Sequence, residues 1–154
     1  MIERELIFIT DSVKSKEEAL NKMMITAKRM GLIASIEDFS AAVLKREEEF
    51  PTAIGHSIAI PHGKSDTVMQ PFVAFMKTAH DIVWSEVSSG PVRFIFLLGV
   101  PQADEQTIHL KILSQLSRQL LKADFNEKLA NYNEVESFYE LLKGIEKKVY
   151  EQED

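Results

Sequence analysis

The run Val92-Arg93-Phe94-Ile95-Phe96-Leu97-Leu98 constrains the fold more than any other stretch of the chain. Its nearly unbroken apolar character predicts a strand covered on both faces, because a strand with one face in water alternates apolar and polar residues. Helical patterns precede and follow this run, so we expect layers of helix on both sides of a sheet. The 154 residues have no repeat or low-complexity linker, which favours a single domain over residues 1–154.

Local signals place the other elements. Ser15, with Glu18 three residues later, has the capping-box pattern and predicts a helix that ends at Gly31. A second helix is expected from Ser35 to about Glu49, since a proline at position 51 disfavours helical backbone at position 50. Shorter strands are expected at 7–9, 57–60 and 71–76. Candidate caps of three later helices are Asp104, Asp124 and Asn133.

Composition excludes several classes of function. Eighteen basic residues against 24 acidic ones give a net charge of −6, which is not the basic footprint of a nucleic-acid-binding protein. The chain has no cysteine, so disulfides, thiolate nucleophiles and thiolate metal sites are excluded together. No window approaches the ~18 consecutive apolar residues of a membrane-spanning helix. The first residues lack the pattern of a secretory signal, and we expect a cytoplasmic protein.

Four histidines are the candidate nucleophiles and ligands: His56, His62, His80 and His109. His62 follows a strand-like run and lies between Pro61, which stiffens the backbone, and Gly63, which allows another molecule to approach closely. Such a position suits a reactive group at the end of a strand, although spacing alone slightly favours an ordinary loop histidine.

The other three histidines give weaker signals. From spacing alone, His56 is expected in a solvated loop, His109 on the apolar stripe of its helix, and His80 in a surface turn or as an imidazole oriented by Asp81. The spacing of the histidines does not favour a zinc site, and no metal is expected.

Arg46 begins the charged stretch 46–49 that closes the second helix, close in sequence to His62. An arginine near a helix C-terminus interacts favourably with the helix dipole, and its fork also suits phosphate. No glycine pattern of a nucleotide-binding loop is present, so no nucleotide cofactor is expected.

Residues 46–64 read REEEFPTAIGHSIAIPHGK. This string resembles the signature of the IIA components of the fructose–mannitol class of the bacterial phosphoenolpyruvate-dependent sugar phosphotransferase system. The family pattern is an acid, six residues, an apolar residue, Gly, two residues, then apolar-Ala-apolar-Pro-His-Gly. Glu47, Ile54, Gly55 and residues 58–63 satisfy every position. Residues 96–101 and 109–117 are similar to the family's second block, so the likeness covers nearly the whole chain.

The resemblance implies a three-layer α/β/α sandwich, with a mixed central sheet between helical layers. It implies that His62 is phosphorylated, that His109 is the second active-site histidine, and that Arg46 lines the site. These roles replace the plainer interpretations that spacing alone favoured for His109 and Arg46.

The resemblance also implies a relay. Phospho-HPr donates its phosphoryl group to His62, and a IIB component accepts it on a cysteine, while a membrane IIC component selects the sugar. We expect Nε2 of His62 as the nucleophile and Nδ1–H held by a backbone carbonyl. Thr52 and Ser57 are candidate minor donors to the phosphoryl group, and Lys64 is expected in solvent. A shallow apolar surface around the site is expected to dock the partners.

Two further features bear on partner choice. An acidic rim that includes Glu47 or Glu48 would steer a basic carrier. Many family members have a small residue such as Asn at the position of His56 and Gly at that of Ser57, so these two residues are expected to alter the pocket rim or the choice of partner.

Two alternatives remain open beside sugar transport. A regulator of the nitrogen-related branch would use the same histidine to control other proteins, and a degenerate module would not transfer phosphate at all. The presence of both His62 and His109 argues against the degenerate module. The sequence leaves the sugar open, because fructose-like, mannitol-like and other polyol substrates fit equally.

Overall fold

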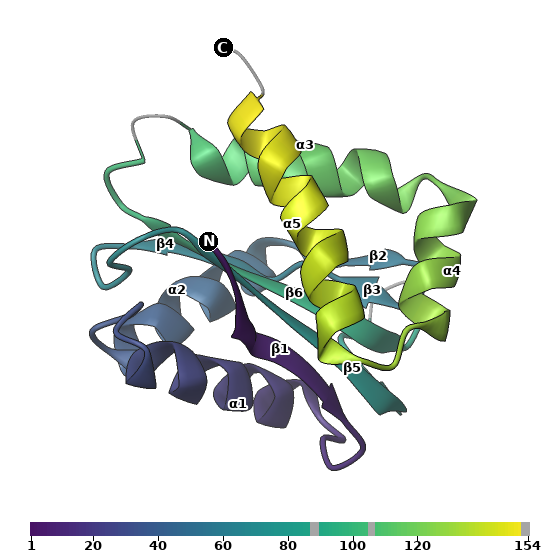
Figure 1. The fold of residues 1–154 in the computed structure, drawn as a ribbon. Coiled ribbons are helices and arrows are strands. Elements are labelled where there is room, and N and C mark those ends of the chain that lie inside the picture. Colours follow the sequence, from purple (N-terminus) through teal and green to yellow (C-terminus); the bar gives the residue numbers. More distant parts are fainter. Residues whose placement is uncertain (87–89, 105–106, 152–154) are drawn as a thin grey trace.

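A mixed sheet of six strands forms the centre of the molecule in the computed structural model, which describes residues 1–86, 90–104 and 107–151 (Figure 1). The strands are β1 (Ile2–Thr10), β2 (Ala53–Gly55), β3 (Ile58–Ala59), β4 (His62–Ser65), β5 (Phe72–Ile82) and β6 (Val92–Pro101). Their order is β1-β5-β6-β3-β2, and β4 also pairs with β6. The β5–β6 and β2–β3 pairs are antiparallel, whereas β1 is parallel to β5, and β3 and β4 are parallel to β6.

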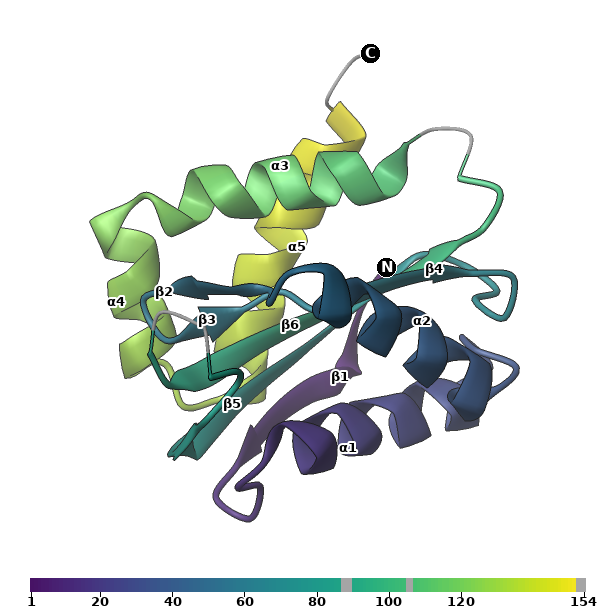
Figure 2. The same ribbon diagram turned by 180° about the vertical axis from the view of Figure 1, so that it is seen from behind.

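Helices cover both faces of this sheet (Figures 1 and 2). One face carries α1 (Lys16–Arg29) and α2 (Ile36–Glu49), and the other carries α3 (Ile108–Leu120), α4 (Ala123–Asn131) and α5 (Val135–Glu151). The expected three-layer α/β/α sandwich with a mixed central sheet is therefore confirmed. No helix within the described residues is long and apolar enough to cross a membrane.

Strand β6 builds a core on each side of the sheet. Ile95 and Leu97 pack into the cluster under α1 and α2, while Phe96 and Leu98 pack into the cluster under α3, α4 and α5. All four side chains are fully buried. Burying a side chain of this size contributes about 1.5–3 kcal/mol to the free energy of folding. The apolar run of β6 therefore stabilises the packing of the helices on both faces of the sheet.

The N-caps of the first two helices are confirmed. The Ser15 hydroxyl accepts a hydrogen bond from the Glu18 amide at 3.1 Å, and the Ser35 hydroxyl accepts one from the Asp38 amide at 3.1 Å. Helix α2 ends at Glu49, where Phe50 takes up the extended backbone that its following proline favours.

The caps expected for the last two helices are wrong. Asp124 lies in the first turn of α4, after an N-cap at Lys122 that has no side-chain hydrogen bond. Asn133 accepts a hydrogen bond from the Lys77 ammonium at 3.1 Å, and α5 begins two residues later. Asp104 does cap α3, because its carboxylate accepts from the Ile108 and His109 amides at 2.8 and 3.2 Å.

Candidate functional site

His62 is held on the sheet by strand pairing. It is the first residue of β4 and lies opposite Leu98 of β6, on the same edge where β3 pairs further along. The Leu98 amide donates to the Pro61 carbonyl at 3.0 Å, and the Ile60 amide donates to the Thr52 carbonyl at 3.0 Å. The backbone that leads into His62 is therefore hydrogen-bonded to β6 through Pro61 and to Thr52 through Ile60.

The ring of His62 has a defined tautomer. Its Nδ1 lies 3.0 Å from the Ile60 carbonyl oxygen, which can only accept a hydrogen bond. In the neutral ring Nδ1 therefore carries the proton and Nε2 carries the free electron pair. The expected hydrogen bond from Nδ1–H to a backbone carbonyl is confirmed.

Burial lowers the pKa of His62 from its usual value, and the positive charge of Arg46 adds to this effect against the opposing hydrogen bond to Ile60. The ring thus stays neutral to lower pH than a solvated histidine does. A neutral imidazole with a free Nε2 is the nucleophilic form.

Gly63 has a different role from the expected one. A Cβ at this position would lie 2.9 Å from Val43 Cγ2 and 3.1 Å from a ring carbon of Phe39. The absent side chain therefore lets helix α2 pack closely on β4, and it does not serve the approach of another molecule. Because α2 carries Arg46, this close packing also positions the arginine relative to His62.

A pocket of about 740 Å³ brings the three predicted site residues together. Arg46 comes from α2, His62 from β4 and His109 from α3. The remaining lining residues are Phe50, Pro51, Thr52, Ala53, Ile54, Ile60, Leu110, Leu113 and Ser117. Three segments that lie far apart in the sequence thus converge on one hollow that contains two imidazoles and a guanidinium.

Asp104 orients His109, a contact that sequence reasoning missed. His109 Nδ1 lies 2.5 Å from the Asp104 carboxylate, whose side chain is only 3% exposed. Burial raises the pKa of the Asp104 carboxyl, but the hydrogen bonds from the His109 ring and from two backbone amides outweigh it and hold that pKa below its usual value. The only available signal was the five-residue spacing, which indicated nothing more than a cap.

Arg46 also closes the turn after α2. Its guanidinium donates a hydrogen bond to the Phe50 carbonyl at 2.7 Å, and the residue is half-buried at the pocket wall. The other donor positions of the guanidinium fork are available for an anion in the pocket.

Glu47 is buried and does not lie on a rim, so its expected role in steering a partner is wrong. Its carboxylate accepts hydrogen bonds from the Thr52 amide at 3.2 Å, from the Thr52 hydroxyl, and from the Trp84 indole at 2.9 Å. The Lys16 ammonium lies 3.7 Å away. This acid therefore fixes the loop that leads to the pocket. The Thr52 hydroxyl donates to Glu47 and has no proton left for a phosphoryl group, which excludes it as a donor.

His56 and Ser57 form the turn between β2 and β3. Both have positive φ, 55° and 64°, as the two central residues of a type I′ hairpin turn require. The described lining of the pocket includes neither residue, so the structure does not place them at its rim. Lys64 is exposed, as expected.

His80 lies inside β5 and not in a turn. Its Nε2 bonds the Asp11 carbonyl at 2.7 Å, while Asp81 pairs with Arg93 at 2.6 Å, so the expected His80–Asp81 pair is absent. Among the described residues, no three His, Asp or Glu side chains are grouped so that they could hold a metal ion.

The model of one protein family matches residues 1–145 of the chain. Its description is "Phosphoenolpyruvate-dependent sugar phosphotransferase system, EIIA 2". The chain belongs to this family. The resemblance carried by residues 46–64 is thereby confirmed, and the match extends over residues 1–145 and not over a short motif alone.

Relatives of this EIIA protein come from two branches. A "PTS system fructose-specific EIIA component" of Haloferax volcanii is 34% identical over 141 residues, 92% of this chain and 91% of that one. A "Nitrogen regulatory protein" of Bradyrhizobium diazoefficiens is 31% identical over 143 residues, 92% of each chain. The chain also matches part of longer proteins and spans 23% of a fructose-specific EIIABC component of Bacillus subtilis.

Solved structures of both kinds share the fold. The complex of enzyme IIA of the mannitol system with phosphorylated enzyme IIB from Escherichia coli aligns with a TM-score of 0.77 at 26% identity, covering 94% of this chain and 98% of that one. Nitrogen regulatory protein IIA-Ntr from Neisseria meningitidis aligns with a TM-score of 0.79 at 26% identity, covering 90% and 93%.

Proposed function

We propose that this protein carries a phosphoryl group on Nε2 of His62, which it accepts from phospho-HPr and passes to a cysteine of a IIB component during sugar uptake. The observation that supports this most is the His62 ring itself. Its Nδ1–H is held by the Ile60 carbonyl, and its Nε2 is left free in a pocket that also contains Arg46 and His109.

Acceptance of the phosphoryl group is a displacement at phosphorus. The Nε2 electron pair of His62 forms the new N–P bond while the N–P bond of the donor phosphohistidine breaks and its electron pair returns to the donor ring. The Nδ1 proton of His62 stays on the ring, where the Ile60 carbonyl stabilises the positive charge of the phosphorylated imidazole. No metal or nucleotide is needed, because the donor is already an activated phosphoramidate.

Phosphoryl transfer depends on positioning and on stabilisation of the charge on the three equatorial oxygens. Arg46 offers charged donors in a fixed fork. His109 offers an Nε2–H donor when both ring nitrogens carry protons, and its Nδ1 is oriented by the Asp104 carboxylate. We assign His62 as the nucleophile and Arg46 and His109 as stabilisers of the transferred group.

Three exposed apolar residues surround the pocket and form the proposed docking surface. Phe50, Ile54 and Leu110 are 69%, 44% and 56% exposed, and all three line the pocket. Such a patch suits the small, transient interfaces of a relay. Glu48, two residues before Phe50 in the sequence, is exposed and is the remaining candidate for an acidic rim. A cytoplasmic location is part of this proposal, since the donor is a cytoplasmic carrier.

The partner assignment draws on one relative in particular. The mannitol IIA protein of Escherichia coli, which shares this fold, was solved in complex with phosphorylated enzyme IIB. A IIB protein as the acceptor is therefore supported at the level of the family. The sugar itself is not assigned, because the membrane component selects it.

Regulation is the second candidate function, favoured by the similarity to nitrogen regulatory proteins over 92% of the chain. Reconstitution with labelled phosphoenolpyruvate, enzyme I, HPr and a fructose-class IIB protein separates the two. A transporter component passes the label to the IIB cysteine, and a Cys→Ser variant of that IIB protein is the control. Label that reaches this protein but no IIB protein would favour regulation, and no label on this protein would contradict both functions.

A further inference from the structure

A groove between α3, α4 and α5 lies on the opposite face of α3 from the histidine pocket. One hollow of about 420 Å³ extends from α3 to α4 along α5, and a second of about 550 Å³ adjoins it between α3 and α5. Gln119 and Lys148 line both hollows. Along α3 the histidine pocket is lined by positions 109, 110, 113 and 117, of which 110 and 117 lie nearly opposite position 119 at helical spacing.

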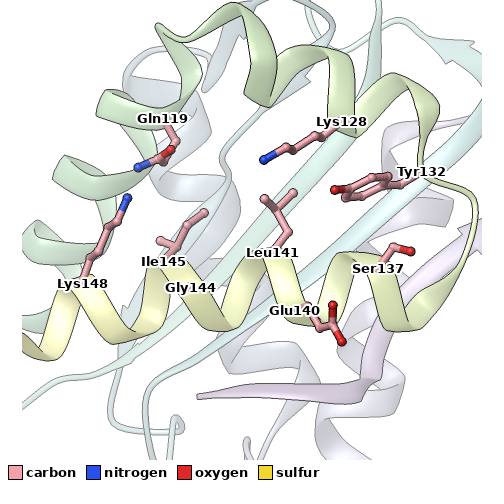
Figure 3. A pocket seen from close by; sticks show the side chains of 9 residues that line it. All are labelled: Gln119, Lys128, Tyr132, Ser137, Glu140, Leu141, Gly144, Ile145 and Lys148. Atoms are coloured by element: carbon pink, nitrogen blue, oxygen red, sulfur yellow. The ribbon is translucent and has the colours of Figure 1, made fainter.

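An amide side chain lines this groove. Gln119 is 9% exposed and lines both hollows, and no buried side-chain nitrogen or oxygen of the described residues lacks a hydrogen-bond partner, so its amide is not an orphaned buried group. Figure 3 shows it pointing from α3 across the groove toward Lys148 of α5. The amide offers both a donor and an acceptor to a ligand in the groove.

Two cations face the same space. Figure 3 shows Lys128 of α4 and Lys148 of α5 reaching into the groove from different helices, while Glu140 points away from both ammonium groups. Within residues 1–86, 90–104 and 107–151, neither ammonium has a hydrogen-bond or ion-pair partner. Arg118 and Lys122 add positive charge along the second hollow, where Glu151 is the one acid in the described lining. This groove is thus a locally basic site on a chain with a net charge of −6.

A glycine keeps the groove open. Gly144 lines its floor in the middle of the 17-residue helix α5, and a Cβ built there meets no atom within 4 Å. Glycine inside a helix is less favourable than alanine by about a fivefold factor in the folding equilibrium, and no steric contact among the described residues requires it here. Leu141 and Ile145 beside it supply an apolar floor.

From these features we propose that the groove is a binding site for a small phosphorylated organic compound, distinct from the histidine pocket. Two unpaired ammonium groups favour a dianion such as a phosphate monoester over a monocarboxylate. The Gln119 amide suits a hydroxyl of the ligand, and the apolar floor suits its carbon chain. This inference does not depend on the relay through His62.

Calorimetric titration of the full chain tests the proposal with glycerol 3-phosphate and fructose 1-phosphate as probes, and with inorganic phosphate, glycerol and fructose as reference compounds. Saturable binding of a phosphorylated probe is expected, with no binding of the uncharged compounds. Lys128→Gln and Lys148→Gln are each expected to weaken that binding about tenfold or more, since each removes a charged hydrogen bond. The matched control is Lys147→Gln, which changes an exposed neighbour that does not line the groove.

A variant that fills the groove checks the location. Gly144→Leu is expected to abolish binding without loss of folding, because the added side chain meets open space and replaces a helix-interior glycine. Binding that persists in Gly144→Leu, or that Lys147→Gln weakens as much as Lys148→Gln, would overturn the proposal. Absence of binding of both phosphorylated probes would overturn it too. Phosphorylation from phospho-HPr is measured in parallel and is expected to be unchanged in all these variants.

Discussion

The two histidines of the pocket differ in what holds Nδ1. In His62 the partner is a neutral backbone carbonyl, and the ring pKa is lowered mainly by burial, so the ring remains a neutral nucleophile. In His109 the partner is the buried Asp104 carboxylate, which suits a ring that must donate from Nε2 to an anion. One residue type thus suits the two chemical roles that we propose for this pocket, because the neighbours of the two rings differ.

Asp104→Asn tests this difference. Asparagine still caps α3 well but removes the negative charge at His109 Nδ1. We expect phosphorylation of His62 by phospho-HPr to slow by about 10–100-fold, as for other orienting partners of a functional histidine, with the fold retained. Rapid-quench kinetics measures the rate, and Asp124→Asn in the first turn of α4 is the control. An unchanged rate would remove Asp104 from the mechanism.

The lowered pKa of His62 predicts a pH dependence of both rate and stability. The rate of phosphoryl acceptance should hold as the pH falls through 6.5 and decline only near the lower pKa of the folded protein. Below pH 6.5 the unfolded chain binds more protons at this residue than the folded one, so the free energy of unfolding should fall as the pH falls.

Urea unfolding between pH 7.5 and 5.5 measures the stability effect. The wild type should lose more stability over this range than His62→Gln does, since the variant lacks the titrating ring. An equal loss in both proteins would show that the pKa of His62 is not lowered.

At the scale of elements, the hairpin turn between β2 and β3 carries strain. His56 and Ser57 both have positive φ, where Asn and Gly are the favoured residues. The double change His56→Asn with Ser57→Gly is expected to raise the free energy of unfolding by about 1–2 kcal/mol and to leave phosphorylation unchanged. Thermal and urea unfolding measure the first effect. A lower stability would mean that these side chains make contacts that outweigh the strain.

The close packing of α2 on β4 predicts that a side chain at position 63 lowers the stability of the protein. Gly63→Ala should lower the free energy of unfolding by about 1–3 kcal/mol and slow phosphorylation, because its Cβ displaces Val43 and with it the helix that carries Arg46. The control is Gly144→Ala, whose Cβ meets open space and whose helix should gain about 1 kcal/mol. Equal stability of the two variants would contradict the packing argument.

Features that depend on residues nearby in the sequence were predictable from it. Features that depend on pairing or contact between distant segments were not. Ser15 and Ser35 cap their helices through atoms three residues away, and the apolar run of β6 marks its own burial. In contrast, residues 62–65 have no strand pattern of their own and form β4 because β6 pairs with them. The contact of Asp104 with the His109 ring likewise depends on how the loop before α3 is placed.

At the scale of the whole molecule, the sequence alone predicted helices on both sides of a sheet, whereas the mixed strand order came only from the family resemblance. Local patterns do not encode which strands become neighbours, since β1 pairs with β5 across more than sixty residues. The convergence of Arg46, His62 and His109 on one pocket follows from that strand order and could not be derived from spacing. The motif pointed to His62, which does line the pocket, whereas Glu47 was misplaced on a rim because spacing carries no information on burial.

The measurement that tests the account most directly is the intact mass of the protein after incubation with phosphoenolpyruvate, enzyme I and HPr. The account predicts one acid-labile phosphoryl group on the wild type and on His80→Gln, whose ring lies outside the pocket, and none on His62→Ala. A phosphoryl group that persists on His62→Ala, or a wild type that gains none, would contradict the assignment of His62 as the carrier.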